Sequence, residues 1–244
     1  MNFERLHHQR IAETLQCLDA SLLRDHACWF GGGTAIAMRH GEYRESVDMD
    51  FMVSELASYR SLRELCRGPE GILALFRAGQ QRVRQWREVR ADQYGIRTMV
   101  SIANQPIKLE IVLEGRIAFD VATRVDEICG VATLTARDMV ASKLLANSDR
   151  WADDGVFSRD LIDLAMMQPK AALLRQGIQK AEGAYGKAIR QDVLKALERL
   201  ANRAGWLERC LLTMGMSVPK AVVWQRLRGV RRVFQAEPKA INRA

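Results

Sequence analysis

The sequence predicts a protein of the α+β class, with strands in its first part and helices alone in its second. Alternation of apolar and polar residues, which is typical of half-buried strands, occurs at about residues 46–53, 97–103 and 107–114. Beyond about Val131 this alternation disappears, and segments with helical periodicity run almost to the end. We therefore expect a first domain over residues 1–132 and a helical domain over residues 133–244.

The composition is that of a folded, basic protein. Its 244 residues include 37 Lys and Arg against 29 Asp and Glu, for a net charge of +8, and 48% are hydrophobic. These values exclude a disordered, collagen-like or fibrous chain, and the surplus charge favours polyanionic partners. No run approaches the about eighteen apolar residues of a membrane span, and the polar start predicts no signal peptide. We expect a cytoplasmic protein without a membrane partner.

The five cysteines are scattered and form no CxxC pair, so neither a disulfide framework nor a zinc knuckle is expected.

The N-terminal region predicts a helix, a strand and a glycine turn. Four apolar residues recur on one helical face: Ile11, Leu15, Leu18 and Leu22. The apolar run 27–30 then ends at three consecutive glycines, residues 31–33. Thr34 follows as the expected cap of a second helix.

The segment 46–53 predicts a strand with one apolar face, formed by Val47, Met49, Phe51 and Val53. A helical pattern interrupted at residues 68–69 then runs to about Val89. Its last part is a candidate basic patch with five arginines: Arg77, Arg82, Arg84, Arg87 and Arg90.

Strands 97–103 and 107–114 are expected to form a hairpin through residues 104–106. In the second half, Thr135 and Asp138 resemble a capping box that opens a helix to Leu145. Further helices are expected at residues 158–167, 171–180, 187–202 and 219–234. From Lys220 onward the chain holds seven Lys or Arg against the single acid Glu237.

Asp48 and Asp50 carry the first chemical signal. Two residues apart in a strand, their carboxylates project from one face and repel each other. A divalent cation relieves that repulsion, and hard oxygen ligands suit Mg²⁺. The alternative is a solvated acidic strand face.

The glycine turn strengthens the metal interpretation. A strand, a glycine turn and a helix start aim backbone N–H groups at an anion such as phosphate. Lys108 and Glu110 share one face of the later strand, so Glu110 is a candidate third carboxylate, the alternative being a surface ion pair. Three carboxylates beside a phosphate site are typical of two-metal phosphoryl or nucleotidyl transfer from a nucleoside triphosphate (NTP).

These residues resemble a known family. The stretch FGGGTAIAMRHGEYRESVDMDF is similar to the first motif of the AbiEii/AbiGii nucleotidyltransferase toxins. The motif positions here are Gly32, Gly33, Arg44, Ser46, Asp48 and Asp50. The segment IKLEI resembles the second motif, and LTARDMVASKLLANSDRWADDGVFSRDLIDL resembles the remaining ones, with Lys143, Arg159, Asp160 and Asp163.

The resemblance implies a polymerase-β-like nucleotidyltransferase core with a mixed β-sheet, followed by a helical domain that completes the active site. It also implies a toxin paired with a cognate antitoxin in a toxin–antitoxin or phage-defence operon. Family members transfer a nucleotide, some of them to the acceptor end of tRNA.

The resemblance further implies roles for single residues. The catalytic residues would be Asp48, Asp50, Lys143 and Asp160, with Asp48, Asp50 and Glu110 at the metal. The NTP would contact Gly32, Gly33, Thr34, Arg44, Ser46 and Lys143. Taken singly, Lys143 could be an exposed helix lysine, and Asp160 with Asp163 a solvated pair. Glu114 is an alternative to Glu110 as third carboxylate, and we choose Glu110.

The sequence therefore predicts a Mg²⁺-dependent toxin that transfers NMP from an NTP to RNA, with tRNA as the expected acceptor, and releases pyrophosphate. The alternatives are transfer to a protein or to a small molecule such as an aminoglycoside, and a non-catalytic module that binds nucleotides or partners. Exposed arginines could hold an RNA backbone. Trp86 and Tyr94 either stack on bases or simply pack. The basic C-terminus is either a solvated segment or a face for an acidic antitoxin.

Overall fold

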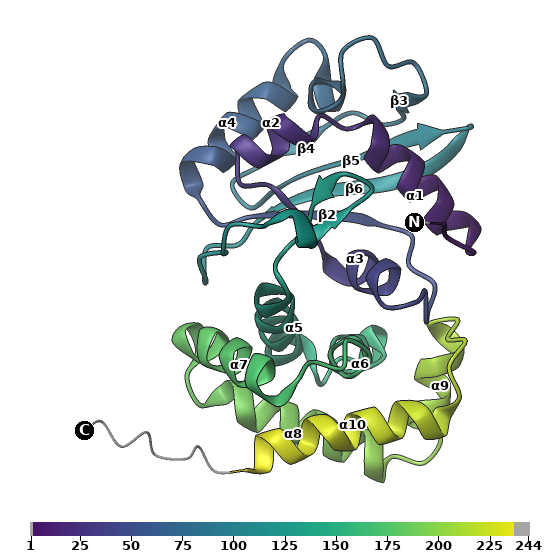
Figure 1. Ribbon diagram of the computed structural model, residues 1–244, viewed down its shortest axis with the longest axis vertical. Coiled ribbons are helices and arrows are strands. Elements are labelled where there is room, and N and C mark those ends of the chain that lie inside the picture. The colour runs from purple at the N-terminus through teal and green to yellow at the C-terminus, as the bar shows by residue number, and fades with distance from the viewer. Residues whose placement is uncertain (1, 237–244) are drawn as a thin grey trace. The chain divides into compact units, whose positions relative to one another are not determined.

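The computed structural model describes residues 2–236 of the chain (Figure 1). Contacts divide the chain into two compact units after Met139. The predicted functional division between residues 132 and 133 stays a prediction. The basic C-terminal segment is described only in part, because Glu237, Lys239 and Arg243 lie outside the described residues.

The first unit is built on a six-stranded mixed sheet. Its main path runs β1-β2-β6-β5-β3, and β4 also pairs with β5. The β2–β6 pair is parallel, and the other pairs are antiparallel. The strands are β1 (Trp29–Gly31), β2 (Met49–Val53), β3 (Val83–Gln85), β4 (Arg90–Ala91), β5 (Gly95–Ile102) and β6 (Gln105–Leu113). A separate pair, β7 (Glu127–Ile128) and β8 (Val131–Ala132), follows.

Helices cover the apolar side of this sheet. The helices of the first unit are α1 (Leu6–Cys17), α2 (Ala20–Asp25), α3 (Gly32–Arg39) and α4 (Leu56–Arg67), with short 3₁₀ turns η1 (Gly71–Leu75) and η2 (Arg124–Asp126). Helix α1 packs against β5, and α4 packs against β2 and β4. Met49, Phe51 and Val53 are buried as predicted, whereas Val47 is 43% exposed because the strand begins only at Met49.

Three predictions for the first unit need correction. The helix expected to run through Leu22 is two helices, because the Asp19 carboxylate accepts hydrogen bonds from the N–H groups of Ser21 and Leu22 and starts α2. The helical pattern expected to reach Val89 ends at Arg67, and the later arginines lie on loops, β3 and β4. The β5–β6 hairpin is confirmed, but its turn lies at Ala103 and Asn104, both at positive φ, and not at residues 104–106, because β6 already begins at Gln105.

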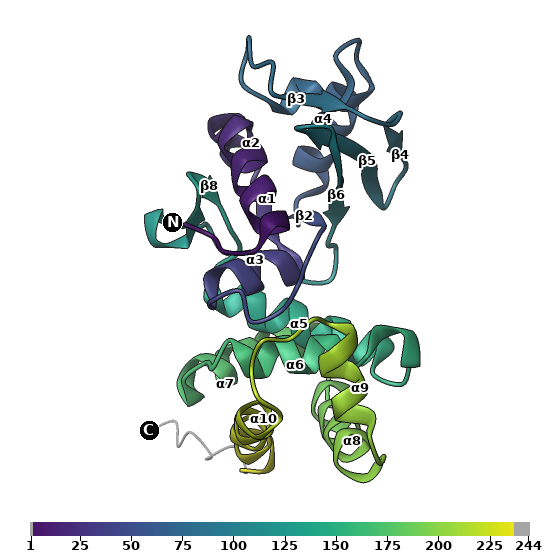
Figure 2. The same ribbon diagram turned by 90° about the vertical axis from the view of Figure 1, so that its right-hand side faces the viewer.

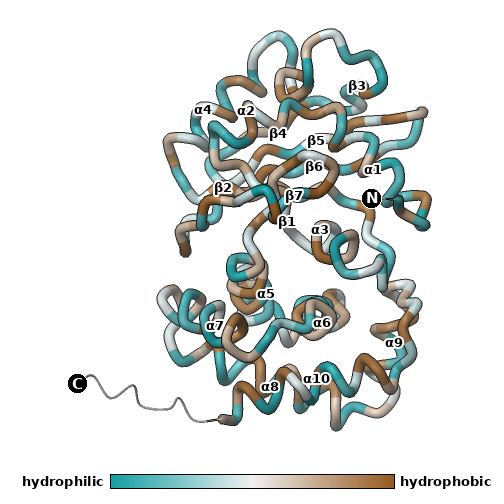
Figure 3. Tube along the Cα trace, in the orientation of Figure 1, coloured by the Kyte–Doolittle hydropathy of each residue, from teal (hydrophilic) through white to brown (hydrophobic). Residues whose placement is uncertain are grey.

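The second unit is helical, apart from connecting segments, over its described residues. Its elements are α5 (Ala136–Arg150), which begins before the division, η3 (Asp154–Val156), α6 (Arg159–Met166), α7 (Ala171–Tyr185), α8 (Ala188–Asn202), α9 (Trp206–Thr213) and α10 (Lys220–Gln235). Figure 2 shows α10 from near its end, and α10 packs against α6, α7, α8 and α9. Hydrophilic and hydrophobic residues both occur along α10 (Figure 3), and its buried residues Val223, Leu227, Val230 and Phe234 recur every three or four positions.

Sequence reasoning missed α9. The expected helices leave residues 203–218 without a helix, yet Trp206, Leu207 and Cys210 bury one face of this short helix. The predicted α+β class, a mixed sheet followed by helices, is otherwise confirmed. Within residues 2–236, no helix combines the length and the apolar character that crossing a membrane requires.

Two glycines of α7 provide a test of this packing. A Cβ on Gly177 would lie 2.7 Å from Val140 Cβ on α5, whereas one on Gly183 would meet no atom within 4 Å. We expect Gly177→Ala to lower the free energy of unfolding by about 1–3 kcal/mol through overpacking. Gly183→Ala should raise it by up to about 1 kcal/mol through helix propensity. Urea unfolding of both variants measures the difference, and equal effects would contradict the close approach of α5 and α7.

Candidate active site

The glycine turn joins β1 to α3 and requires glycine at Gly32. This residue begins α3 with φ at +66°, a left-handed conformation that other residues rarely adopt. A Cβ there would also lie 2.9 Å from Asp50 Cβ and overlap its carboxylate. Because the first N–H groups of a helix lack partners within the helix, this turn presents donors beside the Asp50 carboxylate.

Thr34 does not cap α3 as predicted. The helix begins two residues earlier, and its capping position is Gly31, so Thr34 lies within the first turn. Its hydroxyl lies 2.7 Å from the Ser46 hydroxyl. This hydrogen bond joins α3 to the segment that leads into β2, and so links the glycine turn to the loop before Asp48.

One row across the sheet collects most of the predicted carboxylates. In register, Gly31 lies opposite Asp50, Asp50 opposite Glu110, Glu110 opposite Arg97, and Arg97 opposite Arg90. Register partners project from the same face of a sheet. The row therefore runs from the glycine turn, through two carboxylates, to two arginines, and we call it the charged row.

Lys108 provides positive charge among these carboxylates. Its ammonium forms an ion pair with Glu110, which also accepts from Arg97 Nε at 3.0 Å. Burial would lower the pKa of Lys108, but the hydrogen bond to Glu110 and the charges of Asp48 and Asp50 raise that pKa above its ordinary value. The three carboxylates thus act together on one cation.

The same contacts bear on metal binding. Across residues 2–236, no group of three His, Cys, Asp or Glu side chains is arranged to hold a metal ion as the side chains stand. Glu110 is held by Lys108 and Arg97. Asp48 and Asp50 are hard oxygen donors in a field that attracts a cation, so their chemistry fits a divalent ion.

Glu114, the alternative third carboxylate, lies elsewhere. It follows the end of β6 and is 7% exposed. Both of its oxygens accept from the Arg116 guanidinium, at 2.8 and 2.6 Å. Because Glu110 and not Glu114 is in register with Asp50, the geometry places Glu110 beside the aspartates.

Arg44 and Ser46 lie on the loop between α3 and β2. Arg44 is only 3% exposed, and its Nη1 donates to the Glu45 carbonyl at 2.7 Å. Its guanidinium carbon also lies 6.0 Å from the centre of the Tyr43 ring. Through these contacts, Arg44 stabilises the loop that carries Asp48.

In the second unit, the predicted lysine and aspartates form one buried cluster. Lys143 Nζ on α5 lies 2.9 Å from Asp160 Oδ1 and 2.7 Å from Asp163 Oδ2, both on α6. All three residues are at most 6% exposed. The alternatives of an exposed lysine and a solvated aspartate pair are therefore wrong, because α5 and α6 pack these side chains together.

Arg150 completes this cluster and was missed in the sequence. Its Nε and Nη2 donate to the two oxygens of Asp160 at 2.7 and 3.0 Å. Arg150 lies two helical turns after Lys143 on the same face of α5, and this spacing is the sequence feature that could have identified it. Burial alone would raise the pKa of Asp160, but Lys143 and Arg150 hold that pKa below its ordinary value.

The start of α6 is fixed by a second contact set. Phe157 and Ser158 both have positive φ, at 54° and 50°. Ser158 Oγ accepts from Trp206 Nε1 at 3.1 Å, and the Phe157 and Trp206 rings stack with centres 6.0 Å apart. These contacts hold the strained junction that places Asp160 in the first turn of α6.

A glycine turn at a helix start beside sheet carboxylates is an arrangement suited to an enzyme that transfers phosphoryl or nucleotidyl groups. The chain belongs to the family described as nucleotidyl transferase AbiEii toxin, type IV toxin–antitoxin system, whose model matches residues 14–226. It is thus a nucleotidyltransferase of a toxin family whose systems pair the toxin with an antitoxin. The predicted family is confirmed.

Two solved structures from Helicobacter pylori are also similar. The crystal structure of a presumed nucleotidyltransferase from H. pylori is 17% identical, with a TM-score of 0.43, over 96% of this chain and 99% of the other. The crystal structure of JHP933 from H. pylori is 16% identical, also with a TM-score of 0.43, over 95% of this chain and 96% of the other. A search of curated proteins finds no match.

Gly32 can be tested against a glycine of similar conformation. Gly41 has φ at +78°, but a Cβ there would meet no atom within 4 Å. Both Gly32→Ala and Gly41→Ala carry the cost of a left-handed alanine, so their difference isolates the overlap with Asp50. In urea titrations, we expect Gly32→Ala to lower the free energy of unfolding by about 1–3 kcal/mol more than Gly41→Ala does. Equal losses would contradict the close approach of Gly32 and Asp50.

The buried cluster predicts a stability effect of Lys143. Lys143→Met removes the ammonium that contacts Asp160 and Asp163, so we expect the unfolding free energy to fall by about 3–5 kcal/mol. Lys170→Met, at an exposed position, should change it by no more than about 0.5 kcal/mol. Urea midpoints and m-values measure both changes. Equal urea midpoints for Lys143→Met and the wild type would show that the contacts of Lys143 contribute nothing to stability.

Proposed function

We propose that this protein is a Mg²⁺-dependent toxin of the cytoplasm that transfers NMP from an NTP to RNA, with tRNA as the expected acceptor and pyrophosphate as the second product. The observation that supports the proposal best is the charged row. It sets a glycine turn, suited to phosphate, directly beside Asp50 and its register partner Glu110.

The proposal assigns separate roles to the glycine turn and to the carboxylates. The N–H groups at Gly32, Gly33 and Thr34 would hold the triphosphate. Asp48 and Asp50 would hold Mg²⁺, with Glu110 joining them when Lys108 leaves it. A bound Mg²⁺ stabilises the charge that develops on the phosphate oxygens. The acceptor oxygen would bond to the α-phosphorus as the bond to pyrophosphate breaks, and the hydroxyl proton would be released to solvent.

For Arg44, Ser46, Lys143 and Asp160, the contacts support positioning roles. Arg44 and Ser46 fix the loop before β2. Lys143 and Arg150 fix the ionised state of Asp160. The proposed contact of Lys143 with the triphosphate, and the proposed part of Asp160 in the chemistry, must be tested in variants whose folding is intact.

RNA is favoured as acceptor by the cations beside Asp48 and by exposed aromatic rings. Trp86 is 54% exposed and Tyr94 is 66% exposed, so neither simply packs. Exposed rings of this kind stack on unpaired bases. The family description implies a cognate antitoxin, which we include among the partners of this protein.

Asp48 provides the sharpest test of the chemistry. Purified protein, each of four labelled NTPs, Mg²⁺ and total RNA should yield labelled RNA together with pyrophosphate. Asp48→Asn should reduce the initial rate at least about a hundredfold while the thermal unfolding midpoint stays unchanged. The matched control is Asp25→Asn, an exposed acid on α2, which should keep full activity.

The other outcomes separate the alternatives. Removal of Mg²⁺ with a chelator should stop the reaction, and its return should restore it. If the label appears on a protein or on a small molecule such as an aminoglycoside, that molecule and not RNA is the acceptor. Equal toxicity of the wild type and Asp48→Asn in cells, with no labelled product of any kind, would favour a non-catalytic binding module.

A further inference from the structure

A pocket of about 710 Å³ lies beside Asp48 within the first unit. Its cationic lining residues are Arg87, Arg90, Arg97 and Lys108, and its acids are Asp48 and Glu88. Arg97 and Arg90 belong to the charged row, and Lys108 lies on the same face two residues from Glu110. The pocket therefore adjoins the aspartates at the arginine end of the row, away from the glycine turn.

Two of these cations are not engaged by the protein. Lys108 and Arg97 pair with Glu110, and Arg97 also pairs with Asp92. By contrast, the guanidinium groups of Arg87 and Arg90 have no hydrogen-bond or ion-pair partner within residues 2–236. Both residues are exposed. Their positive charge is thus available to an external anion.

The backbone that carries these arginines is nevertheless fixed. The Arg87 N–H donates to the Met99 carbonyl at 3.2 Å, and Thr98 Oγ1 donates to the Arg87 carbonyl at 2.7 Å. Arg90 lies in β4, paired with Arg97. Two cations on anchored backbone form a binding surface that loses little backbone entropy when it is occupied.

The residue that precedes Arg87 in the chain, Trp86, carries an aromatic ring that is 54% exposed. Its backbone N–H donates to the Met99 carbonyl at 2.7 Å, so the backbone at this position is also anchored. A positively charged groove next to an exposed ring suits a single nucleic acid strand, because the cations contact phosphates and the ring stacks on a base. The carboxylates of an acidic peptide would pair with the arginines but would not stack on the Trp86 ring.

We propose that this pocket binds the sugar–phosphate backbone of the acceptor RNA strand and directs its end to Asp48. The inference rests on the proposed transfer to RNA and divides the site into two anion subsites. The triphosphate takes the glycine turn at β1, and the acceptor strand takes the arginine end at β5 and β4. Three strand spacings of about 4.8 Å separate Gly31 from Arg97, which leaves the carboxylates between the subsites.

The test measures RNA binding without chemistry. The full chain, without NTP, is titrated against a fluorescently labelled single-stranded RNA oligonucleotide by anisotropy at several salt concentrations. Arg87→Gln with Arg90→Gln should weaken binding about tenfold and lower the salt slope by about 1.4, the value for two phosphate contacts to a single strand. Unchanged unfolding midpoints are expected, since neither guanidinium has an internal partner.

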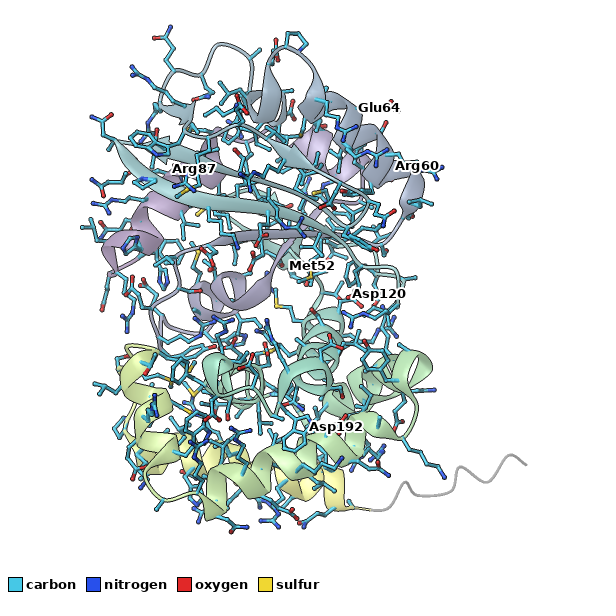
Figure 4. The ribbon with its side chains drawn as sticks, turned by 180° about the vertical axis from the view of Figure 1, so that it is seen from behind. Met52, Arg60, Glu64, Arg87, Asp120 and Asp192 are labelled. Carbon is cyan, nitrogen blue, oxygen red and sulfur yellow. The ribbon has the colours of Figure 1, made fainter. Side chains whose placement is uncertain are left out.

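A matched double variant controls for charge. Arg60→Gln with Arg124→Gln removes two exposed arginines that do not line the pocket. Figure 4 shows Arg60 and Arg87 on opposite sides of the first unit. The control should bind RNA like the wild type. Equal binding and equal salt slopes for the two double variants would overturn the inference.

Transfer assays distinguish this inference from the proposed function. If both hold, the Arg87 and Arg90 double variant raises the KM for RNA and leaves the KM for NTP unchanged. If the wild type labels RNA and the double variant does so with the same kinetics, the subsite is wrong and the function stands. If the double variant loses RNA binding but the wild type labels no RNA, the function fails and the subsite stands. A raised KM for NTP alone would assign the arginines to the triphosphate and overturn the inference.

Discussion

The parallel pairing of β2 with β6 is the constraint on which the candidate site depends. It sets Asp50 opposite Glu110 and fixes which residues of β5 and β4 continue the same row. A shift of one residue would turn Glu110 to the other face of the sheet. Burial of Met49 and Phe51 on that other face opposes such a shift, so the packing of the core maintains the order of charges.

In that order of charges, the carboxylates of β2 and β6 lie next to cations that compensate them. Like carboxylates on adjacent strands repel, and the structure offsets the repulsion with Lys108 and Arg97. The Lys108 ammonium occupies the position among these carboxylates where another cation would also be attracted. The raised pKa of Lys108 reflects the field that a metal ion would also experience. The glycine turn and the unpaired arginines then extend the row at its two ends.

The second unit uses charge in a different way. Lys143, Arg150, Asp160 and Asp163 form a buried cluster in which the cations hold Asp160 ionised despite burial. Removing one member of such a cluster is costly, since the others stay buried. Residues that match family motifs can therefore be essential for folding, and a loss of activity in their variants does not by itself establish catalysis.

The sequence by itself determined the local features of this protein. Periodicity placed β2, the β5–β6 hairpin and most of the helices, and the spacing of Asp48 and Asp50 put both carboxylates on one face. Each of these depends on neighbours in the chain, and the errors at Asp19 and α9 arose where a cap or a buried face outweighed the local pattern. Only the tertiary structure set Glu110, and not Glu114, in register with Asp50, buried Lys143, and left Arg87 and Arg90 unpaired within the described residues. Those outcomes depend on register and packing between residues far apart in sequence, which no local pattern encodes.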